Sequence, residues 1–288
     1  MSYVNRREFG RAVLGAGLAA KLGAAAPKVN SVVHGVTIGV QSYSFRDMPV
    51  DAAIQAMADI GLGVCELTQG HMEPKNVSRE QLRKWRLEVS LDQFRAVGQK
   101  FRDAGIEVYA YHYSFKEDFT DPEIERGFQM AQALGARYIT ASSNVSTSPR
   151  IDPLAQKYKM RVGMHNHSNI KPNEFATPDD FAAAMRGRSK FIAMNLDIGH
   201  FTAAGFDAVK YLAEHHADIL TLHIKDRKKN QGENVPFGQG DTPIKQVLAL
   251  LRDKKYKIPA NIEYEYKGSD TVAEVRKCLD YCKQALSA

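Results

Sequence analysis

The sequence predicts an α/β protein that folds as a single (β/α)8 TIM barrel. From residue 36 onward, short apolar segments typical of strands alternate with segments typical of helices, and the connections are short. Eight such units in one direction predict parallel strands with helical crossovers, and eight strands close a barrel. A doubly wound open sheet is the alternative, but no Gly-x-Gly-x-x-Gly motif follows the first expected strand.

Each expected strand is a short run rich in apolar and β-branched residues, as buried parallel strands are. These runs cover residues 36–45, 63–68, 106–113, 136–142, 161–166, 191–197, 218–224 and 258–266. The expected helices have helical periodicity, and several begin at a capping residue or end at a glycine. They cover residues 50–60, 78–104, 121–135, 152–159, 177–187, 203–216, 242–254 and 270–286. The barrel domain is therefore expected to span residues 36–286.

The composition is that of an ordinary globular protein. The chain has 288 residues, of which 44% are hydrophobic and 25% charged, enough to bury the core of one barrel. Its formal net charge is +6, but residues 1–26 hold four basic side chains and one acidic, so the remainder carries +3. This charge is too small to indicate nucleic acid as a partner.

The amino-terminal segment predicts export. Arg6 and Arg7 precede an Ala/Gly/Leu-rich stretch, which ends in the small residues Ala24 to Ala26. This order is typical of a twin-arginine signal with a cleavage site, so residues 1–26 are expected to be removed in the periplasm. The apolar part is too short and glycine-rich to span a bilayer, so no membrane attachment is expected after cleavage. An uncleaved amphipathic extension is the alternative.

Four polar side chains near the ends of four expected strands indicate one divalent-metal site. They are His165, Asp197, His223 and Glu263, at intervals of 32, 26 and 40 residues. Such intervals are typical of strand–helix–strand repeats, whose strands end at the same side of the barrel. Imidazole and carboxylate ligands together suit Mn, Zn, Co or Fe. Since two of the four ligands are carboxylates, whose oxygens also bind Mg, Mg is an alternative. Alternatively, each residue only finishes its own strand.

Further polar side chains near the strand ends are candidates for contact with a substrate. His167, His200 and Lys225 lie close in sequence to the expected ligands and are candidates for catalysis, although His167 and His200 could instead support the ligands. Gln41, Glu66 and His112 lie near the ends of the first three expected strands, and His71 follows the second; these residues are candidates for substrate binding, with packing as the alternative. The charged run after Lys225, "DRKKN", is expected to be a solvated loop.

Several of these motifs resemble the xylose-isomerase-like barrel family, which includes sugar epimerases, inosose dehydratase and AP endonucleases. The motifs are Asp197-x-x-His200, the strand with "HNH", "LHIKD" and the closing "IEYEY". The resemblance covers residues 36–286. It implies that Asp197, His223 and Glu263 bind a metal and that His200 contacts the substrate.

One position departs from the family pattern. In the ketose 3-epimerases the ligand on strand five is a glutamate that also moves a proton, whereas His165 stands at the matching position here. Those epimerases use two carboxylates, one on each face of the substrate. Of this pair, only Glu263 remains here. A metal-bound imidazole is a poor base, so Glu263 or His167 is expected to take the proton, with Lys225 and His200 contacting the substrate.

The resemblance and the metal site together predict a sugar isomerase or epimerase that abstracts a proton alpha to a carbonyl. An exported enzyme would rarely meet phosphorylated metabolites, so the expected partner is an unphosphorylated sugar or glycoside. A 3-keto-glycoside lyase or hydratase is an alternative, because elimination shares the same first step. The sequence also leaves open an AP endonuclease-like phosphodiesterase, which the low charge disfavours, and a non-catalytic sugar-binding barrel, which the ligand set disfavours.

Overall fold

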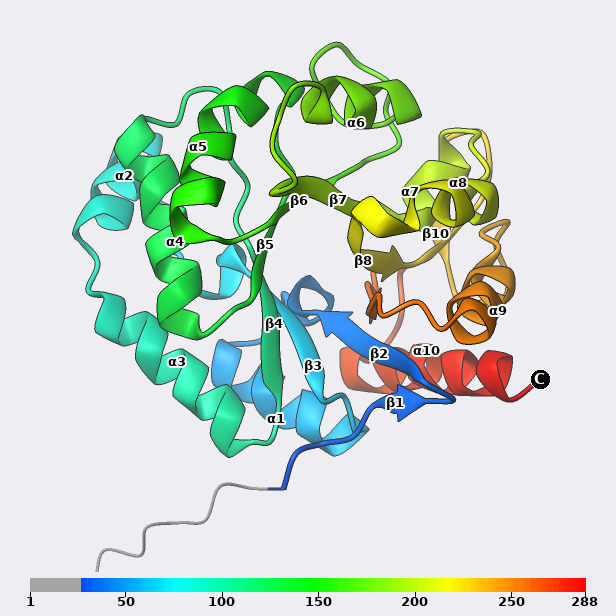
Figure 1. The fold of residues 1–288 in the computed structure, drawn as a ribbon. Helices are drawn as coiled ribbons and strands as arrows, with labels where there is room; N and C mark the ends of the chain where they lie inside the picture. Colours follow the sequence, from blue (N-terminus) through cyan, green and yellow to red (C-terminus); the bar gives the residue numbers. More distant parts are fainter. Residues whose placement is uncertain (1–26) are drawn as a thin grey trace, which may run out of the picture.

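The computed structural model describes residues 27–288, and the proposed export signal lies outside them. Eight parallel strands close a barrel, and helices surround it (Figure 1). In order, the strands are β2 (Val36–Gln41), β3 (Val64–Thr68), β4 (Glu107–His112), β5 (Tyr138–Ala141), β6 (Val162–His165), β7 (Ile192–Asp197), β8 (Ile219–Ile224) and β11 (Ala260–Ile262). The pairing of β2 with both β3 and β11 closes the ring. This architecture confirms the predicted TIM barrel.

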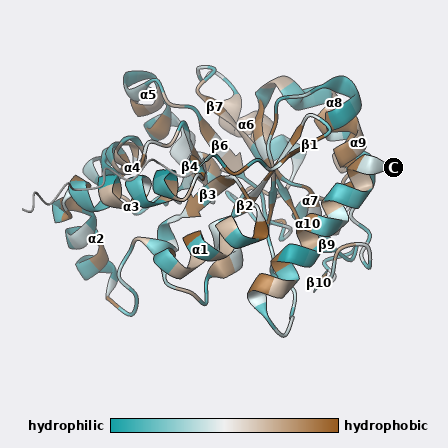
Figure 2. Ribbon diagram, turned by 90° about the horizontal axis from the view of Figure 1, so that it is seen from below, coloured by the Kyte–Doolittle hydropathy of each residue, from teal (hydrophilic) through white to brown (hydrophobic). Residues whose placement is uncertain are grey.

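Helices connect the strands and cover the outside of the barrel. They are α1 (Val50–Ile60), α2 (Arg79–Glu88), α3 (Leu91–Asp103), α4 (Asp121–Leu134), α5 (Ser148–Tyr158), α6 (Pro178–Met185), α7 (Ile198–Ala203), α8 (Ala208–His215), α9 (Ile244–Lys254) and α10 (Thr271–Ser287). Figure 2 shows hydrophobic residues concentrated in the central strands and both kinds of residue along helices such as α10. The helices thus bury one face against the strands. Within residues 27–288, no helix has the length and apolar character needed to cross a membrane.

Three helices differ from the sequence prediction. The helix expected over residues 78–104 is two helices, because Val89 is extended and Ser90 caps α3 by accepting from the backbone N–H of Asp92. The fourth helix begins at Ser148 rather than residue 152, with a proline in its first turn. The helix expected over residues 203–216 begins only at Ala208, as α8, because Gly205 takes a positive φ of 93°, and the unexpected helix α7 lies before it.

Short elements outside the barrel ring complete the fold. β1 (Val32–Val33) pairs antiparallel with β2, and α10 lies beside this first part of the chain (Figure 1). β9 (Asp226–Arg227) and β10 (Asn234–Val235) form a small antiparallel ladder in the loop after β8. This loop lies at the carboxyl end of the barrel, where the candidate site is found.

Candidate metal centre

The four predicted ligands converge at the carboxyl end of the barrel. One ligand atom from each of His165, Asp197, His223 and Glu263 lies within 4.8 Å of the others, and all four residues are buried. Strand register produces part of this arrangement, because Asp197 on β7 pairs directly with His223 on β8. Glu263 directly follows β11, whose Asn261 is also beside His223.

The facing atoms of the cluster are the ones that lack hydrogen-bond partners. His165 Nε2, Asp197 Oδ2, His223 Nδ1 and Glu263 Oε2 are all buried and without one. His165 Nε2 lies 3.5 Å from Asp197 Oδ2, and His223 Nδ1 lies 3.1 Å from Glu263 Oε2. Buried polar atoms are rarely left unpaired unless an ion or water completes them. Two imidazoles and two carboxylates therefore fit a divalent cation such as Zn, Mn, Co or Fe.

Neighbouring groups orient each ligand toward this centre. Asp197 caps α7 with Oδ1, which accepts from the backbone N–H of His200 at 2.7 Å, so its other carboxylate oxygen, Oδ2, is the one that faces the centre. The backbone of Asp197 is fixed by Asn166, whose Oδ1 accepts from its N–H at 2.9 Å. On His165, Nδ1 lies 3.3 Å from Ser142 Oγ, which directs Nε2 to the centre. Hydrogen bonding of the distal nitrogen is a usual way to fix a metal-binding imidazole.

The protonation of the two histidine ligands differs. Burial and the neighbouring His223 and His167 lower the pKa of His165 well below its usual range, which favours the neutral ring that metals require. Burial also opposes charge on His223, but Glu66 and Glu263 outweigh it and raise its pKa well above the usual range. In the absence of metal, His223 therefore holds a second proton.

Lys225 places an ammonium group against the centre. Its Nζ lies 2.8 Å from Glu263 Oε2 and 3.2 Å from Asp197 Oδ2, and it also pairs with Glu265. Burial disfavours the charge on Lys225, but the three carboxylates outweigh it and raise its pKa. Burial likewise disfavours the charge on Glu263, but Lys225 and His223 hold its pKa well below the usual range. Both groups are therefore charged at neutral pH.

His200 lies between two cationic side chains beside the centre. Arg227 Nη1 lies 2.6 Å from its Nδ1, and Lys225 Nζ lies 3.1 Å from its Nε2. Both cations can only donate, and a neutral imidazole accepts at one nitrogen, so the ring accepts from one of them at a time. Burial and Lys225 lower the pKa of His200 despite Asp197, which favours the neutral ring. His200 lines the cavity and can contact a substrate oxygen there.

A polar cavity of about 550 Å³ opens above the centre. Among the predicted site residues, its walls include Gln41, His112, His165, His167, His200, Lys225 and Glu263. His167 is accessible at the mouth, where partial burial by the walls and the charge on Lys225 lower its pKa. The cavity therefore brings together all four side chains that were predicted to be catalytic, with Glu263 serving also as a ligand.

Two predicted substrate contacts lie elsewhere. Glu66 on β3 is fully buried inside the barrel and is not among the residues that line the cavity. His71 lies outside the cavity wall, where its Nδ1 is 3.0 Å from Ser42 Oγ and its Nε2 is 3.2 Å from Phe45 O. Both placements speak against direct contact with a substrate, because Glu66 lies too deep and both ring nitrogens of His71 are already occupied by the chain.

The sequence prediction of a solvated loop after Lys225 is wrong at its first two residues. Asp226 is 2% exposed and its carboxylate accepts from the backbone N–H groups of Gly238, Gly240 and Thr242 at 2.7, 2.9 and 3.2 Å. Arg227 lines the cavity. The signal available in the sequence was the glycine-containing "FGQGD" segment, whose backbone can approach a carboxylate closely.

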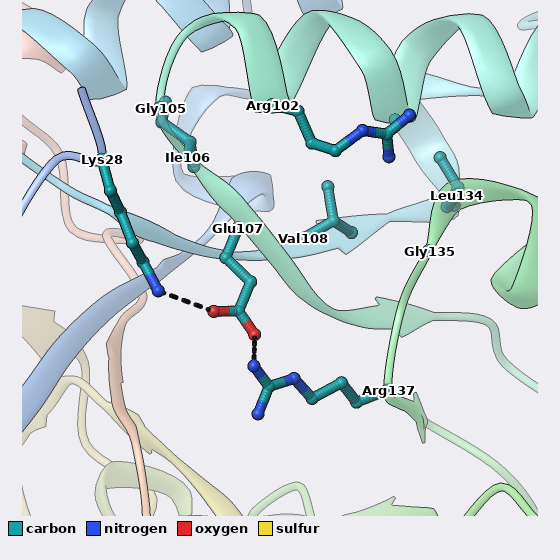
Figure 3. A pocket seen from close by; sticks show the side chains of 10 residues that line it. Lys28, Arg102, Gly105, Ile106, Glu107, Val108, Leu134, Gly135 and Arg137 are labelled. Carbon is teal, nitrogen blue, oxygen red and sulfur yellow. Dashed lines mark hydrogen bonds and ion pairs between the residues drawn. The ribbon is translucent and has the colours of Figure 1, made fainter. Parts of the chain in front are cut away.

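A second cavity, of about 360 Å³, lies near the amino end of β4. Figure 3 shows Glu107 between Lys28 and Arg137, which lie 3.2 and 2.7 Å from its two carboxylate oxygens. The carboxylate in this cavity is thus already paired with two cations. Its lining has neither unpaired buried polar atoms nor ligand-type clusters among the described residues, so we assign the chemistry to the opposite end of the barrel.

Comparison with known proteins agrees with the fold. The pattern of the family described as "Xylose isomerase-like TIM barrel" matches residues 54–285. An uncharacterised protein of Methanocaldococcus jannaschii is 23% identical over 255 residues, covering 82% of this chain and 86% of that one. L-ribulose-5-phosphate 3-epimerase UlaE of Escherichia coli is 32% identical over 92 residues, covering 32% of each chain. The crystal structure of 3-keto-D-glucoside 4-epimerase YcjR from E. coli is similar with a TM-score of 0.66 at 13% identity, covering 86% of this chain and 99% of that one.

Proposed function

Because this chain belongs to the xylose isomerase-like TIM barrel family, we propose that it is a metal-dependent enzyme acting on an unphosphorylated sugar. The proposed reaction is isomerisation or epimerisation that begins with removal of a proton from the carbon beside a carbonyl. The observation that carries this proposal is the convergence of two imidazoles and two carboxylates, all buried, on one point at the floor of a polar cavity.

Sugars as the substrate class are supported by two similar proteins. UlaE is named as an epimerase of L-ribulose 5-phosphate, and YcjR as an epimerase of a 3-keto-D-glucoside. The cavity walls offer hydroxyl, amide and imidazole groups, which can bond the hydroxyls of a sugar.

The state of the two cations in the cavity wall favours a substrate without phosphate. Lys225 is already paired with three carboxylates. Arg227 donates from Nε and Nη2 to Gly232 O, and from Nη1 to Ser168 Oγ and His200 Nδ1. The charge of Lys225 is thus balanced by carboxylates and most N–H groups of Arg227 are already bonded, whereas a phosphate group usually requires uncompensated Arg or Lys charge.

The side chains then divide the reaction among them. A bound divalent metal would polarise the carbonyl and stabilise negative charge that develops on its oxygen. Glu263, or His167 at the cavity mouth, is positioned to accept the proton from carbon. Lys225 and His200 would contact the substrate oxygens, since both lie beside the centre and line the cavity. Because Glu263 is the one carboxylate that remains of the family's catalytic pair, we expect the proton to be removed from only one face of the sugar.

Elimination is the second candidate, because it shares the first step and also needs only one base. A 3-keto-glycoside would lose its aglycone after proton removal instead of being reprotonated. The replacement of the family's strand-five glutamate by His165 supports this candidate, since the second carboxylate used for reprotonation on the opposite face is missing.

Incubation in deuterium oxide tests both candidates. The metal-loaded protein is mixed with free ketoses, aldoses and 3-keto-glycosides, and the products are read by NMR. Carbon-bound deuterium in recovered or rearranged sugar supports the isomerase or epimerase, and release of the aglycone with an unsaturated product supports the lyase. The Asp197→Ala variant should be inactive, and Asp92→Asn, on the exposed start of α3, serves as the control. If no substrate exchanges a proton, the non-catalytic sugar-binding barrel takes the place of the proposal.

A further inference from the structure

Glu66 is a fully buried carboxylate inside the barrel, directly beneath the metal centre. Its exposure is 0%, and it is not part of the cavity wall. Placing an ionised carboxylate in a barrel interior is costly unless donors surround it.

Donors from several strands hold this carboxylate in one orientation. Gln41 Nε2 and Thr140 Oγ1 each donate to Oε1 at 2.6 Å, and Asn261 Nδ2 donates to Oε2 at 3.1 Å. Because the carboxylate is bonded from β2, β5 and β11 at once, it cannot rotate freely. It presents a fixed acceptor to His223 on β8.

The ring of His223 is oriented by that acceptor. Its Nε2 lies 2.9 Å from Glu66 Oε1, the oxygen that already accepts from Gln41 and Thr140, so Nε2 is the nitrogen that donates and carries the proton. The second ring nitrogen, Nδ1, is then the one that faces Asp197 Oδ2 and Glu263 Oε2, at 3.9 and 3.1 Å. A flipped ring would direct Nδ1 at Glu66 and lose this arrangement.

We infer that Glu66 is a positioning residue of the metal centre, which fixes His223 so that it binds the metal through Nδ1. Glu66 itself touches neither metal nor sugar. Since His165 presents Nε2, the two histidines are assigned to bind through different nitrogens. This inference rests on the metal site of the proposed function, and is independent of which sugar reacts.

Titration of the purified protein with Co²⁺ tests this role. Removing such a supporting carboxylate typically weakens metal binding about 10- to 100-fold, so we expect this loss in Glu66→Gln. Glu66→Asp keeps the charge but shortens the side chain, and we expect weaker binding there too. The visible spectrum of bound Co²⁺ should change in both, because the imidazole is no longer held.

Glu123→Gln is the matched control. Glu123 is also a fully buried carboxylate, but it pairs with Arg83 on the outer helices, 2.8 Å from its Nε. This variant should lose stability and keep the Co²⁺ affinity and spectrum of the wild type. Affinities of both Glu66 variants within about twofold of the wild type, with an unchanged spectrum, would make Glu66 a structural residue only and overturn the inference.

A measurement on the wild type requires no variant to fold. In Zn²⁺-loaded protein with ¹⁵N-labelled histidine, one ligand ring should be bound through Nδ1 with a slowly exchanging proton on Nε2, and one through Nε2. Two rings bound through Nε2 would contradict the inference. A protein that shows the expected rings but turns over no sugar would contradict the proposed function alone, and a wild type that binds no metal would contradict both.

Discussion

The two carboxylate oxygens of Asp197 have different roles, one in capping a helix and one in the proposed metal site. Oδ1 caps α7, and Oδ2 faces the metal centre. Asparagine caps a helix about as well as aspartate but is a poor metal ligand, so we expect Asp197→Asn to lose metal and keep the cap. Asp197→Ala should lose both, with the missing cap costing about 1 kcal/mol of unfolding free energy.

Elemental analysis and thermal unfolding of the metal-free variants check this division. Equal metal content in wild type and Asp197→Asn would remove Asp197 from the ligand set. If the Ala and Asn variants unfold at the same temperature, the cap makes no measurable contribution.

We expect His223 to make metal binding depend on pH. Its pKa is raised above the usual 6.5, so the metal must displace a proton from Nδ1 near neutral pH. His165 has a lowered pKa and releases none there. We therefore expect about one proton released per metal, and an affinity that rises with pH until the raised pKa of His223 is passed.

Calorimetry in buffers of different ionisation enthalpy counts the released protons. A metal affinity that stays constant from about pH 6 to 8, with no proton release, would show that His223 is already neutral in the metal-free protein.

Lys225 competes with the metal for the same carboxylates. Its ammonium lies 2.8 Å from Glu263 Oε2, so Lys225→Met removes a cation from the centre while keeping most of the side-chain volume. We expect metal affinity to stay equal or increase, and kcat to fall about 10²- to 10³-fold through loss of a donor to the developing negative charge. Metal titration and steady-state kinetics separate the two effects. If metal affinity and kcat both fall, Lys225 is a structural support of the ligands.

The sequence located the ligands better than their surroundings. The four proposed ligands lie at or next to the carboxyl ends of four strands, and parallel strands end at one side of a barrel, so their meeting was predictable. Glu66 was expected to touch substrate but lies beneath the cavity, two residues before the end of β3, because depth within a barrel is not visible in sequence. Its partners come from β2, β5, β8 and β11, and their convergence appears only in the closed barrel.

At the scale of elements, the loop after β8 is held by one buried side chain. Asp226 accepts from three backbone N–H groups of residues 238–242, and a Cβ at Gly240 would lie 2.0 Å from Asp226 Oδ1. Gly240 is thus required for this close approach. Arg227, the next residue, connects the loop to His200 and Ser168.

Asp226→Ala should therefore release the loop without removing a ligand. Three hydrogen bonds to a charged group stabilise it by several kcal/mol, so we expect amide exchange over residues 227–242 to become at least about 100-fold faster. KM for the sugar should rise while metal affinity stays unchanged, because His200 loses its orientation. Hydrogen-exchange mass spectrometry and kinetics check this, with Asp241→Ala as the control, since Asp241 bonds only the N–H of Lys229 in the same loop.

Element boundaries were less predictable than element types. The break at Val89 and Ser90 occurs inside a continuous polar, helix-favouring stretch. Burial of Val89 against the core, together with the Ser90 cap, outweighs that local preference. Likewise α7 was not expected, because Asp197 ends a strand and caps a helix at a single position.

At the scale of the whole molecule, the site exists only when nearly the entire chain has folded. Its ligands extend from residue 165 to residue 263, and β2 must pair with β11 to close the ring that holds them. If the protein is exported, as its amino-terminal segment predicts, metal bound in the cytoplasm can be kept only if the protein crosses the membrane in its folded state.

The arginine pair at positions 6 and 7 predicts that route. The twin-arginine pathway is expected to carry the folded barrel, so periplasmic protein should begin near residue 27 and already contain metal. Changing Arg6 and Arg7 to lysine should leave an unprocessed, metal-containing protein in the cytoplasm, whereas changing Lys21 to arginine, which keeps the charge, should not affect export. Amino-terminal sequencing and elemental analysis of the two cell fractions check both points. If the wild-type protein is found only in the cytoplasm and with Met1 intact, the export prediction is wrong. If the lysine variant still yields processed protein in the periplasm, the protein is exported by another pathway.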